Sequence, residues 1–370
     1  MALFKEKIKK ILAGADILID GEREWDIQVH DERLYRRIIT RGTMGLGEAY
    51  MDGWWDCRKL DEFFYRVIGT HLHTENKGIG HDFYRFLTNL LNKQTIRRSF
   101  EVGEWHYDIG NDLYKAMLDK RIVYSCGYWK DAKNLDEAQE NKLDLICRKL
   151  KLKVGQKVLD IGCGWGSFAK FAAEKYGVEM TGITISKEQV SLAEELTKGL
   201  PVDIKFLDYR KVEGVFDHIV SVGMFEHVGP KNYRTFMKVA GLHLKNDGIF
   251  LLHTIGGNYS DTSPDPWIEK YIFPNGAVPN IESIGKAVRG IFVVEDWHNF
   301  GADYDKTLMA WHHNFEKNWD KLKNRYSERF RRMWNYYLLS CAGSFRARDA
   351  QLWQIVLTKG GLPGGYESVR

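Results

Sequence analysis

The chain has 370 residues, of which 44% are hydrophobic and 28% charged, a composition typical of a globular protein with about two domains. Its formal net charge is only +4, which argues against nucleic acid as a partner. No uncharged apolar run reaches the roughly 18 residues of a membrane-spanning helix, and the N-terminal MALFKEKIKKILAGA lacks the apolar core of a signal peptide. The five cysteines show neither disulfide nor zinc-ligand spacing, which favours reduced thiols in the cytoplasm and no metal.

Residues 1–77 are predicted to form a small accessory domain of mixed α/β type. Residues 1–13 combine an apolar stripe with four lysines, so a membrane-surface helix and a helix packed on its own domain remain open. The stretches ADILIDG and WDIQVHD are typical of strands, and RLYRRIIT and LDEFFYRVIG of helices, with a loop, GTMGLGEAYMDGWWDC, between the helices. Residues 78–100 are polar and basic around one helical stretch, FYRFLTNLLN, and are predicted to be a linker.

Between residues 101 and 370, strand-like stretches alternate with helical ones, which predicts a mostly parallel sheet with helices on both faces. Seven strands are expected: Lys157–Gly162, Glu179–Ser186, Ile204–Asp208, Phe216–Gly223, Gly248–Ile255 and the stretches GIFVVEDWHNF and QLWQIVLTK. A long insertion, residues 257–289, separates the fifth strand from the sixth. Insertions of this length often serve as lids.

The stretch KVLDIGCGWGSFA carries the strongest local signal. An apolar strand ends in Asp160, and Gly162, Gly164 and Gly166 then open a helix, which permits a tight turn and a close approach of backbone to a ligand. The spacing differs from the dinucleotide fingerprint, and Asp160 would repel a phosphate there. An acidic residue suits a cation instead. The stretch resembles the first motif of the S-adenosylmethionine (SAM) methyltransferases, which implies a Rossmann-like class I domain and SAM as cofactor.

In the methyltransferases that this loop resembles, the second strand commonly ends in an acidic residue that holds the ribose hydroxyls. This chain has GITISKEQ at that point, so Thr184 and Gln189 are the candidates to replace it. After the third strand, FLDYRK offers Asp208 for the adenine edge and Tyr209 for the adenine face. A solvated turn without ligand contact is the alternative for each of these residues.

Several longer stretches, in the same order along the chain, together resemble one family. They are WHYDIGNDLY, VYSCGYW, VLDIGCGWG, VSVGMFEHVGPKNY, LLHTIG, DPWIEKYIFPNG, EDWHNFGADYDKTLMAWH and CAGSFRARDAQLWQ. The chain is similar over about residues 100–360 to the bacterial cyclopropane-fatty-acyl-phospholipid synthases and to the mycolic acid cyclopropane synthases. The N-terminal stretch GLGEAYMDGWW resembles the extra domain of the phospholipid-acting members.

The resemblance implies transfer of a methylene carbon from SAM to a cis double bond of unsaturated phospholipid acyl chains. The double bond attacks the sulfonium methyl, a carbocation results, and a bound bicarbonate takes the proton whose loss closes the ring. The resemblance also implies a homodimer, with peripheral attachment to the membrane surface from the cytoplasm. Two alternatives remain: a SAM-dependent methyltransferase that leaves a branched methyl on a lipid or other small molecule, and a SAM-binding, catalytically silent membrane-surface protein.

The resemblance also assigns residues to the bicarbonate, namely Cys126, Glu226, His253, Tyr304 and the backbone amide of Ile255. The chemistry is reasonable, because thiol, imidazole, phenol and amide groups donate to an oxyanion while Glu226 accepts the proton of bicarbonate. Taken alone, Glu226 is equally typical of a sheet rim, and His253 and Cys126 of a core. A metal at Glu226 and His227 is disfavoured, since adjacent strand residues point to opposite faces.

Further positions follow from the same resemblance. Tyr124 and Ser125 match positions that touch the cofactor. Cys341 has been viewed as a nucleophile in this family, although the reaction needs no thiolate, so a structural thiol is the alternative. Four bulky aromatic residues are expected either to line the acyl tunnel, where their faces would stabilise a cation, or to pack in the core: Trp267, Phe273, Trp297 and Trp311.

Overall fold

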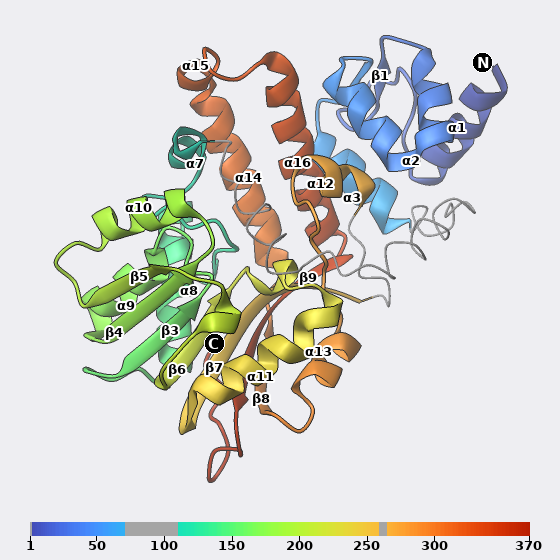
Figure 1. Ribbon diagram of the computed structural model, residues 1–370. Helices are drawn as coiled ribbons and strands as arrows, with labels where there is room; N and C mark the ends of the chain where they lie inside the picture. Colours follow the sequence, from blue (N-terminus) through green and yellow to red (C-terminus); the bar gives the residue numbers. More distant parts are fainter. Residues whose placement is uncertain (1, 71–109, 259–264) are drawn as a thin grey trace. The chain divides into compact units, whose positions relative to one another are not determined.

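The computed structural model describes residues 2–70, 110–258 and 265–370, and these residues form two compact units (Figure 1). The first unit contains residues 2–70, 265–274 and 304–350. The second contains residues 110–258, 275–303 and 351–370. The predicted linker, residues 78–100, lies outside the described residues. Within the described ranges, no helix has both the length and the apolar character that crossing a membrane requires.

The first unit is mainly helical. A two-stranded antiparallel sheet, in which Gln28 pairs with Asp56, lies among its N-terminal helices. Its elements are α1 (Ala2–Gly14), β1 (Gln28–Val29), α2 (Arg33–Met51), β2 (Trp55–Asp56), α3 (Leu60–Gly69), α12 (Pro266–Tyr271), most of α14 (Ala302–Lys317), α15 (Trp319–Leu322) and α16 (Glu328–Arg346). Helix α12 comes from the insertion that was expected to act as a lid.

The stretch GTMGLGEAYM, which was predicted to be a loop, forms the second half of α2, so that prediction is wrong. Gly42, with a φ of 55°, kinks the helix, which then continues to Met51. Packing outweighs the low helix propensity of glycine here. A Cβ at Gly47 would lie 2.5 Å from Cδ1 of Trp267, so only glycine lets α2 approach α12 this closely. The stretch ADILIDG forms a single bridge, at Ile19, where a strand was expected.

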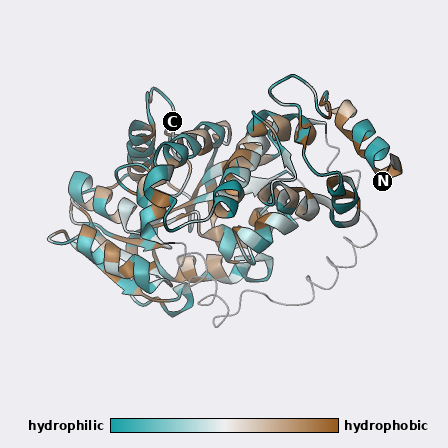
Figure 2. Cartoon of the chain, turned by 90° about the horizontal axis from the view of Figure 1, so that it is seen from above, coloured by the Kyte–Doolittle hydropathy of each residue, from teal (hydrophilic) through white to brown (hydrophobic). Residues whose placement is uncertain are grey.

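Helix α1 packs part of its apolar stripe against its own unit. Ile8 and Leu12 are 4% and 7% exposed, whereas Leu3 is 79% exposed. Lys7 and Lys10 lie on the exposed side, and the alternation of hydrophilic and hydrophobic residues along the helix is visible in Figure 2. The centre of the apolar stripe is therefore buried, whereas Leu3 at its N-terminal end and the two lysines are exposed to solvent.

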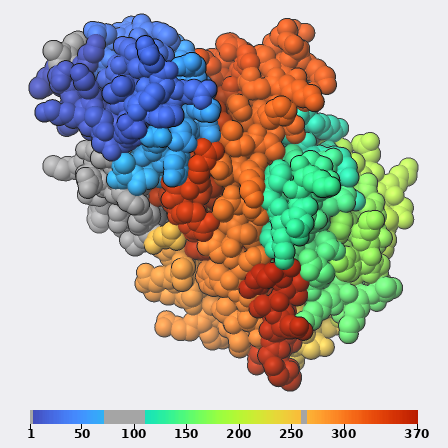
Figure 3. Space-filling model, turned by 180° about the vertical axis from the view of Figure 1, so that it is seen from behind, coloured from blue at the N-terminus to red at the C-terminus, as the bar shows by residue number. Residues whose placement is uncertain are grey.

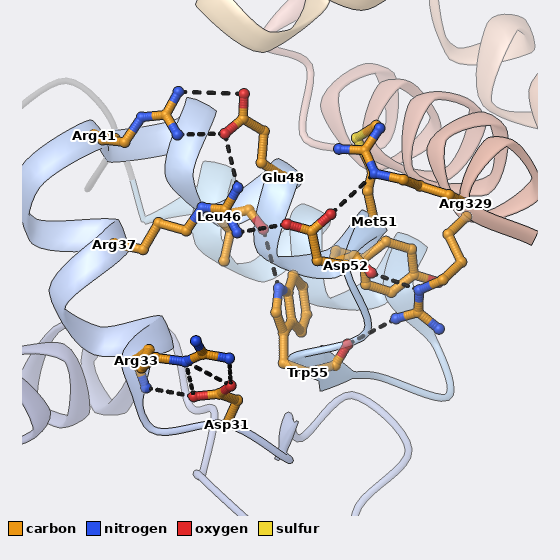
Figure 4. A network of polar contacts seen from close by, with 12 residues as sticks. Asp31, Arg33, Arg37, Arg41, Leu46, Glu48, Met51, Asp52, Trp55 and Arg329 are labelled. Carbon is orange, nitrogen blue, oxygen red and sulfur yellow. Dashed lines mark hydrogen bonds and ion pairs between the residues drawn. The ribbon is translucent and has the colours of Figure 1, made fainter.

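A buried carboxylate, Glu48, organises the polar contacts of the first unit (Figure 4). It accepts hydrogen bonds from Arg37 at 2.9 Å, Arg41 at 3.2 Å, Lys270 at 2.9 Å and Tyr271 at 3.0 Å. Burial opposes ionisation, but these donors lower the pKa of Glu48 to about 2. Asp52 continues the network and accepts from Arg37 at 2.7 Å and from Arg329 at 3.0 Å. The network ties α2 to α12 and α16.

The second unit contains a seven-stranded sheet of order β5-β4-β3-β6-β7-β9-β8. Strands β3 to β7 pair in parallel, and β8 pairs antiparallel with β9, which confirms the predicted mostly parallel sheet. The strands are β3 (Lys157–Ile161), β4 (Glu179–Thr184), β5 (Val202–Phe206), β6 (Phe216–Val222), β7 (Leu244–Gly257), β8 (Val293–Asn299) and β9 (Ala350–Thr358). The helices are α7 (Asn111–Met117), α8 (Leu135–Lys149), α9 (Ser167–Tyr176), α10 (Lys187–Leu196), α11 (Tyr233–His243) and α13 (Ile281–Val288).

Helices cover both faces of this sheet (Figure 1). Along β6, Ile219 belongs to the core cluster that includes α11 and α13, while Val220 belongs to the cluster that includes α8 and α9. Because strand side chains alternate between faces, both positions must be apolar in a sheet that is covered twice. Figure 3 shows the C-terminal residues lying against the part of the chain that contains α8, where the Tyr366 hydroxyl donates to the carbonyl of Lys149 at 2.9 Å.

Candidate active site

The glycine-rich loop joins β3 to α9 and lies at the carboxyl end of the parallel strands, where open α/β sheets bind their ligands. Gly162, Gly164 and Gly166 have φ values of 87°, 55° and 76°, a region that favours glycine. A Cβ at Gly162 would lie 2.6 Å from Cβ of Met224. A Cβ at Gly164 would meet nothing nearer than Nε2 of Gln189, at 3.9 Å. The loop thus leaves open space beside Gly164 that a ligand can fill.

Asp160, the penultimate residue of β3, is 2% exposed, and its Oδ1 has no hydrogen-bond partner among the described residues. Burial raises the pKa of Asp160 to about 7, while the positive charge of Lys142 acts in the opposite direction. Buried polar atoms are nearly always paired, so an orphaned carboxylate oxygen points to a missing cationic or hydrogen-bonding ligand. The ammonium group of SAM meets that need.

The residues expected to hold the ribose lie together at the end of β4. Thr184 Oγ1 donates to Oε1 of Gln189 at 2.6 Å, and both residues are buried. The residues expected near the adenine, Asp208 and Tyr209, follow β5. Both contact other residues of the second unit. Asp208 accepts from Arg210 Nε and Nη2, both at 2.7 Å, and the Tyr209 ring packs edge-on against Phe236.

Glu226 lies just beyond β6, in a short 3-10 helix that spans Phe225–His227. The backbone amide of Ile255 donates to its Oε1 at 2.6 Å, whereas Oε2 is buried without a partner among the described residues. Burial raises the pKa of Glu226 to about 7. One oxygen is therefore fixed by the backbone, and the other is available to a ligand.

His253 lies on the neighbouring strand β7, paired in register with Val222 of β6. It is 1% exposed, and burial lowers its pKa well below the ordinary value, so the ring is neutral. The amide Nε2 of Gln354 lies 3.2 Å from Nδ1. An amide nitrogen only donates, so Nδ1 accepts and the ring proton is on Nε2. That Nε2 has no partner among the described residues and is a donor for an oxyanion.

The segment that carries Tyr124, Ser125 and Cys126 leads into α8. Cys126 is 0% exposed, and its thiol donates to the carbonyl of Gly127 at 3.2 Å. Ser125 is buried, and its Oγ accepts from Lys142 Nζ at 2.9 Å. The Tyr124 ring meets Tyr114 edge-on at a centroid distance of 5.1 Å.

Other expected site residues belong to the first unit. Tyr304 is 9% exposed, and its ring stacks on Phe345 at 4.4 Å. Cys341 lies on α16, where burial raises the pKa of its thiol to about 12. Trp267, Phe273 and Trp311 are also in this unit, with Trp267 and Trp311 fully buried. Trp297 is in the second unit and packs edge-on against Trp353.

Sequence reasoning missed four polar residues of the second unit: Gln139, Lys142, Arg210 and Gln354. A signal for Lys142 was present, because it follows Leu135 by seven residues and Ala138 by four, on the apolar face of α8. Across the described ranges no group of three or more His, Cys, Asp or Glu side chains is arranged to hold a metal ion.

Comparisons with known proteins identify the family of the chain. Residues 94–355 match the family model described as mycolic acid cyclopropane synthetase. The chain is 52% identical over 352 residues to the cyclopropane-fatty-acyl-phospholipid synthase of Escherichia coli (strain K12), covering 95% of this chain and 92% of that protein. A probable fatty acid methyltransferase of Pseudomonas putida is 37% identical over 285 residues, covering 73% of this chain and 72% of that protein.

Solved structures give the same result. The cyclopropane synthase MmaA2 from Mycobacterium tuberculosis superposes with a TM-score of 0.67 at 30% identity, covering 70% of this chain and 98% of that one. The mycolic acid cyclopropane synthase CmaA1, complexed with S-adenosylhomocysteine (SAH) and CTAB, superposes with a TM-score of 0.66 at 31% identity, with the same coverage. The orphaned oxygen of Asp160 and the space beside Gly164 fit a ligand of this kind. The chain belongs to the mycolic acid cyclopropane synthetase family of SAM-dependent enzymes.

Proposed function

We propose that the chain is a cyclopropane-fatty-acyl-phospholipid synthase. It transfers a methylene carbon from SAM to a cis double bond of an unsaturated phospholipid acyl chain, and it releases SAH and one proton per ring. The 52% identity to the Escherichia coli enzyme over nearly the whole chain supports this substrate. The observation in the structure that carries the proposal is two buried atoms without partners among the described residues: Glu226 Oε2, just beyond β6, and His253 Nε2, on the neighbouring strand β7.

Two groups of the second unit support bicarbonate as the bound base. His253 offers an N–H to an oxyanion, and the free oxygen of Glu226 accepts the hydrogen of a bicarbonate hydroxyl. Bound SAM supplies the electrophilic methyl carbon, and bound bicarbonate supplies the base. The expected role of the Ile255 amide changes with the structure, because this amide donates to Glu226. Ile255 therefore positions the carboxylate that orients bicarbonate.

The side chains of the site also limit side reactions. A strong protein nucleophile close to a sulfonium methyl or a carbocation would capture it. The neutral His253, whose Nδ1 already accepts from Gln354, presents an N–H instead of a lone pair. The Cys126 thiol keeps its hydrogen by donating it to the Gly127 carbonyl, so this hydrogen is not directed to bicarbonate, as the resemblance implied. Of these two side chains, neither therefore offers a free imidazole nitrogen or a thiolate to the reacting carbon.

A turnover assay tests the proposal directly. Unsaturated phosphatidylglycerol vesicles are incubated with SAM and the purified full chain, and the acyl products are examined by proton NMR. A high-field cyclopropane resonance is expected. Stripping dissolved carbonate should lower the rate, and adding bicarbonate back should restore it. A branched methyl product would instead favour a fatty acid methyltransferase, the activity named for the 37% identical relative from Pseudomonas putida. No product with intact SAH binding would favour the silent binding protein.

The substrate lies in a bilayer, so we also propose that the protein acts in the cytoplasm as a peripheral membrane protein and as a homodimer. The exposed Leu3, Lys7 and Lys10 of α1 support a contact with anionic lipid. Analytical ultracentrifugation of the full chain tests the dimer, and a monomer at micromolar concentration would exclude it.

A further inference from the structure

Helix α8 directs two polar side chains into the interior of the second unit, against the segment that carries Ser125. Gln139 Nε2 donates to the backbone carbonyl of Ser125 at 2.8 Å, and Lys142 Nζ donates to Ser125 Oγ at 2.9 Å. Gln139 is 0% exposed and Lys142 is 1% exposed. Burying an ammonium group is costly unless its charge is paired or used. A lysine that is buried at this cost is therefore expected to serve a function.

The segment that precedes Ser125 is also held in place by hydrogen bonds. The carboxylate of Asp119 accepts backbone hydrogen bonds from Arg121 at 2.9 Å and from Val123 at 2.8 Å. Between these two residues, Ile122 has a φ of 58°, a conformation that a β-branched residue adopts only under constraint. The backbone is therefore strained three residues before Ser125, and the bonds to Asp119 hold it in this conformation.

The bond from Lys142 determines what Ser125 can do. An ammonium group only donates, so Ser125 Oγ is the acceptor in this pair. The hydroxyl hydrogen of Ser125 must then point away from Nζ, toward some other acceptor. Ser125 is thereby set as a hydrogen-bond donor, with a positive charge directly behind it. An oxyanion is the ligand that this arrangement favours.

The groups that face Lys142 complete the pattern. Asp119, Cys126 and Asp160 act to retain its proton, while His253 stays neutral beside it. Burial lowers the pKa of Lys142 to about 8, so the group is mostly charged at pH 7. Asp160 has the unpartnered Oδ1 described above. Lys142, through Ser125, therefore offers a positively charged donor, and Asp160 offers a negatively charged acceptor. A zwitterionic ligand requires both.

We propose that Lys142 is a positioning residue for the amino-acid end of SAM, which directs the Ser125 hydroxyl toward the carboxylate while Asp160 receives the ammonium group. Of the proposed function, this inference requires only that SAM is the ligand. Bicarbonate is a second oxyanion with the same chemistry, and the experiment distinguishes the two.

The experiment measures ligand binding by calorimetry with two probes: SAH, and 5′-methylthioadenosine, which lacks the amino-acid end. Lys142→Met should weaken SAH on the order of 10- to 100-fold, the range for a lost hydrogen bond to a charged group. It should leave 5′-methylthioadenosine unchanged. The matched control is Lys149→Met, because Lys149 is equally buried on the same helix but its Nζ contacts His298 Nδ1 at 3.0 Å. This control should bind both probes as the unchanged protein does.

Two further measurements separate positioning from simple packing. Above about pH 8, where Asp160 is already ionised, SAH affinity of the unchanged protein should fall as Lys142 loses its proton, whereas Lys142→Arg should keep its affinity and lose that fall. Ser125→Ala should weaken SAH, and adding Lys142→Met to it should cause little further loss, because both changes remove one pathway. Ser125→Ala also serves if Lys142→Met fails to fold.

Three results would overturn the inference. Equal weakening of both probes would show that Lys142 only supports the pocket. Additive losses in the double variant would show that Lys142 does not act through Ser125. Normal SAH affinity with a raised bicarbonate requirement in the turnover assay would place bicarbonate at Ser125. Failure of the proposed function would appear differently, as absence of ring product from the unchanged protein while the two probes are still distinguished.

Discussion

The backbone N–H of Ile255 donates to Oε1 of Glu226 at 2.6 Å, and this bond joins the end of β7 to the short helix after β6. It fixes the carboxylate while its other oxygen stays without a partner among the described residues. Burial raises the pKa of Glu226 from 4.5 to about 7, so the site holds a carboxylate that ionises near neutral pH. A group held at such a cost to the fold is expected at a functional site.

Glu226→Gln should lower turnover on unsaturated phospholipid about 100-fold or more, since the ionised carboxylate orients the base. The rate of the unchanged enzyme should rise with pH through about 7, as Glu226 ionises, and this rise should be absent from the residual activity of the variant. The measurement is a pH–rate profile, with the exposed Glu213→Gln as control. A variant that keeps both its rate and the rise would remove Glu226 from the mechanism.

The same substitution makes a prediction about stability. The folded protein holds the Glu226 proton more tightly than the unfolded chain, so ionising this group lowers stability as pH rises from 4.5 toward 7. Glu226→Gln should therefore leave the urea midpoint at pH 7 equal or higher, although activity is lost. A large fall in the midpoint would show that the carboxylate stabilises the fold instead.

Gly162→Val should abolish SAH binding, because the residue needs a φ of 87° and a Cβ would overlap Met224. The overlap would displace the loop from the position that a ligand requires. Calorimetry with SAH measures the loss, and circular dichroism checks that the sheet remains. Gly199→Ala is the matched control, with a φ of 84° but no atom within 4 Å of the added Cβ. Normal SAH affinity in Gly162→Val would contradict the assignment of the glycine-rich loop to the cofactor.

Cys341→Ser should retain most of the turnover. Burial raises the pKa of the Cys341 thiol to about 12, so the thiolate that nucleophilic attack requires is scarce at neutral pH. The assay is the same ring-forming reaction, with SAH binding as the check on folding. Complete loss of turnover in a variant that binds SAH normally would restore the nucleophile.

Glu48→Gln should destabilise the protein by roughly 1 to 3 kcal/mol at pH 7, since the donors around Glu48 lower its pKa to about 2. A lowered carboxyl pKa contributes stability that is present above pH 4.5 and is lost as pH falls toward 2. Urea unfolding at pH 7 and pH 3 should show a smaller difference between variant and unchanged protein at the lower pH. Glu24→Gln is the control, because its pair with Lys59 is exposed and should matter little.

Lys7→Glu with Lys10→Glu should weaken sedimentation with anionic vesicles and lower turnover on them, at low salt above all. Each lysine near an anionic surface contributes about 1 kcal/mol, and salt screens this attraction. SAH affinity should not change. If the doubly substituted protein sediments and turns over normally at low salt, the membrane contact lies elsewhere.

The sheet of the second unit could be predicted because its strands are continuous apolar runs that end in polar or glycine-rich turns, as doubly covered parallel strands must. The loop after Asp160 was recognisable for a related reason: glycine spacing records backbone conformation directly. By contrast, the Ile255–Glu226 bond joins residues 29 positions apart and depends on the register of β6 against β7. Single-strand patterns contain no such information.

The second half of α2 escaped prediction because its glycines indicate a loop locally. Their reason is a tertiary contact, the approach of Trp267 to Gly47, which is invisible until residue 267 is placed. Lys142 was missed for a different reason. Its place on the apolar face of α8 is visible in the sequence, but a lysine in a helix is normally assigned to solvent, and its bond to Ser125 appears only in the fold.

The first unit is assembled from three stretches of chain, and this has a consequence for biosynthesis. Asp52 cannot bond to Arg329 until that residue, 277 positions later, has been synthesised. Gly47 likewise cannot pack against Trp267 until residue 267 has been synthesised. At about 5 to 20 residues per second, a ribosome needs roughly 15 to 55 s to supply Arg329 after Asp52 has emerged. The part of the protein that is synthesised first is therefore among the last to be completed. Until then Glu48 and Asp52 lack the partners that α12 and α16 supply, and nascent chains stalled within this interval should be especially sensitive to protease near residues 33–56.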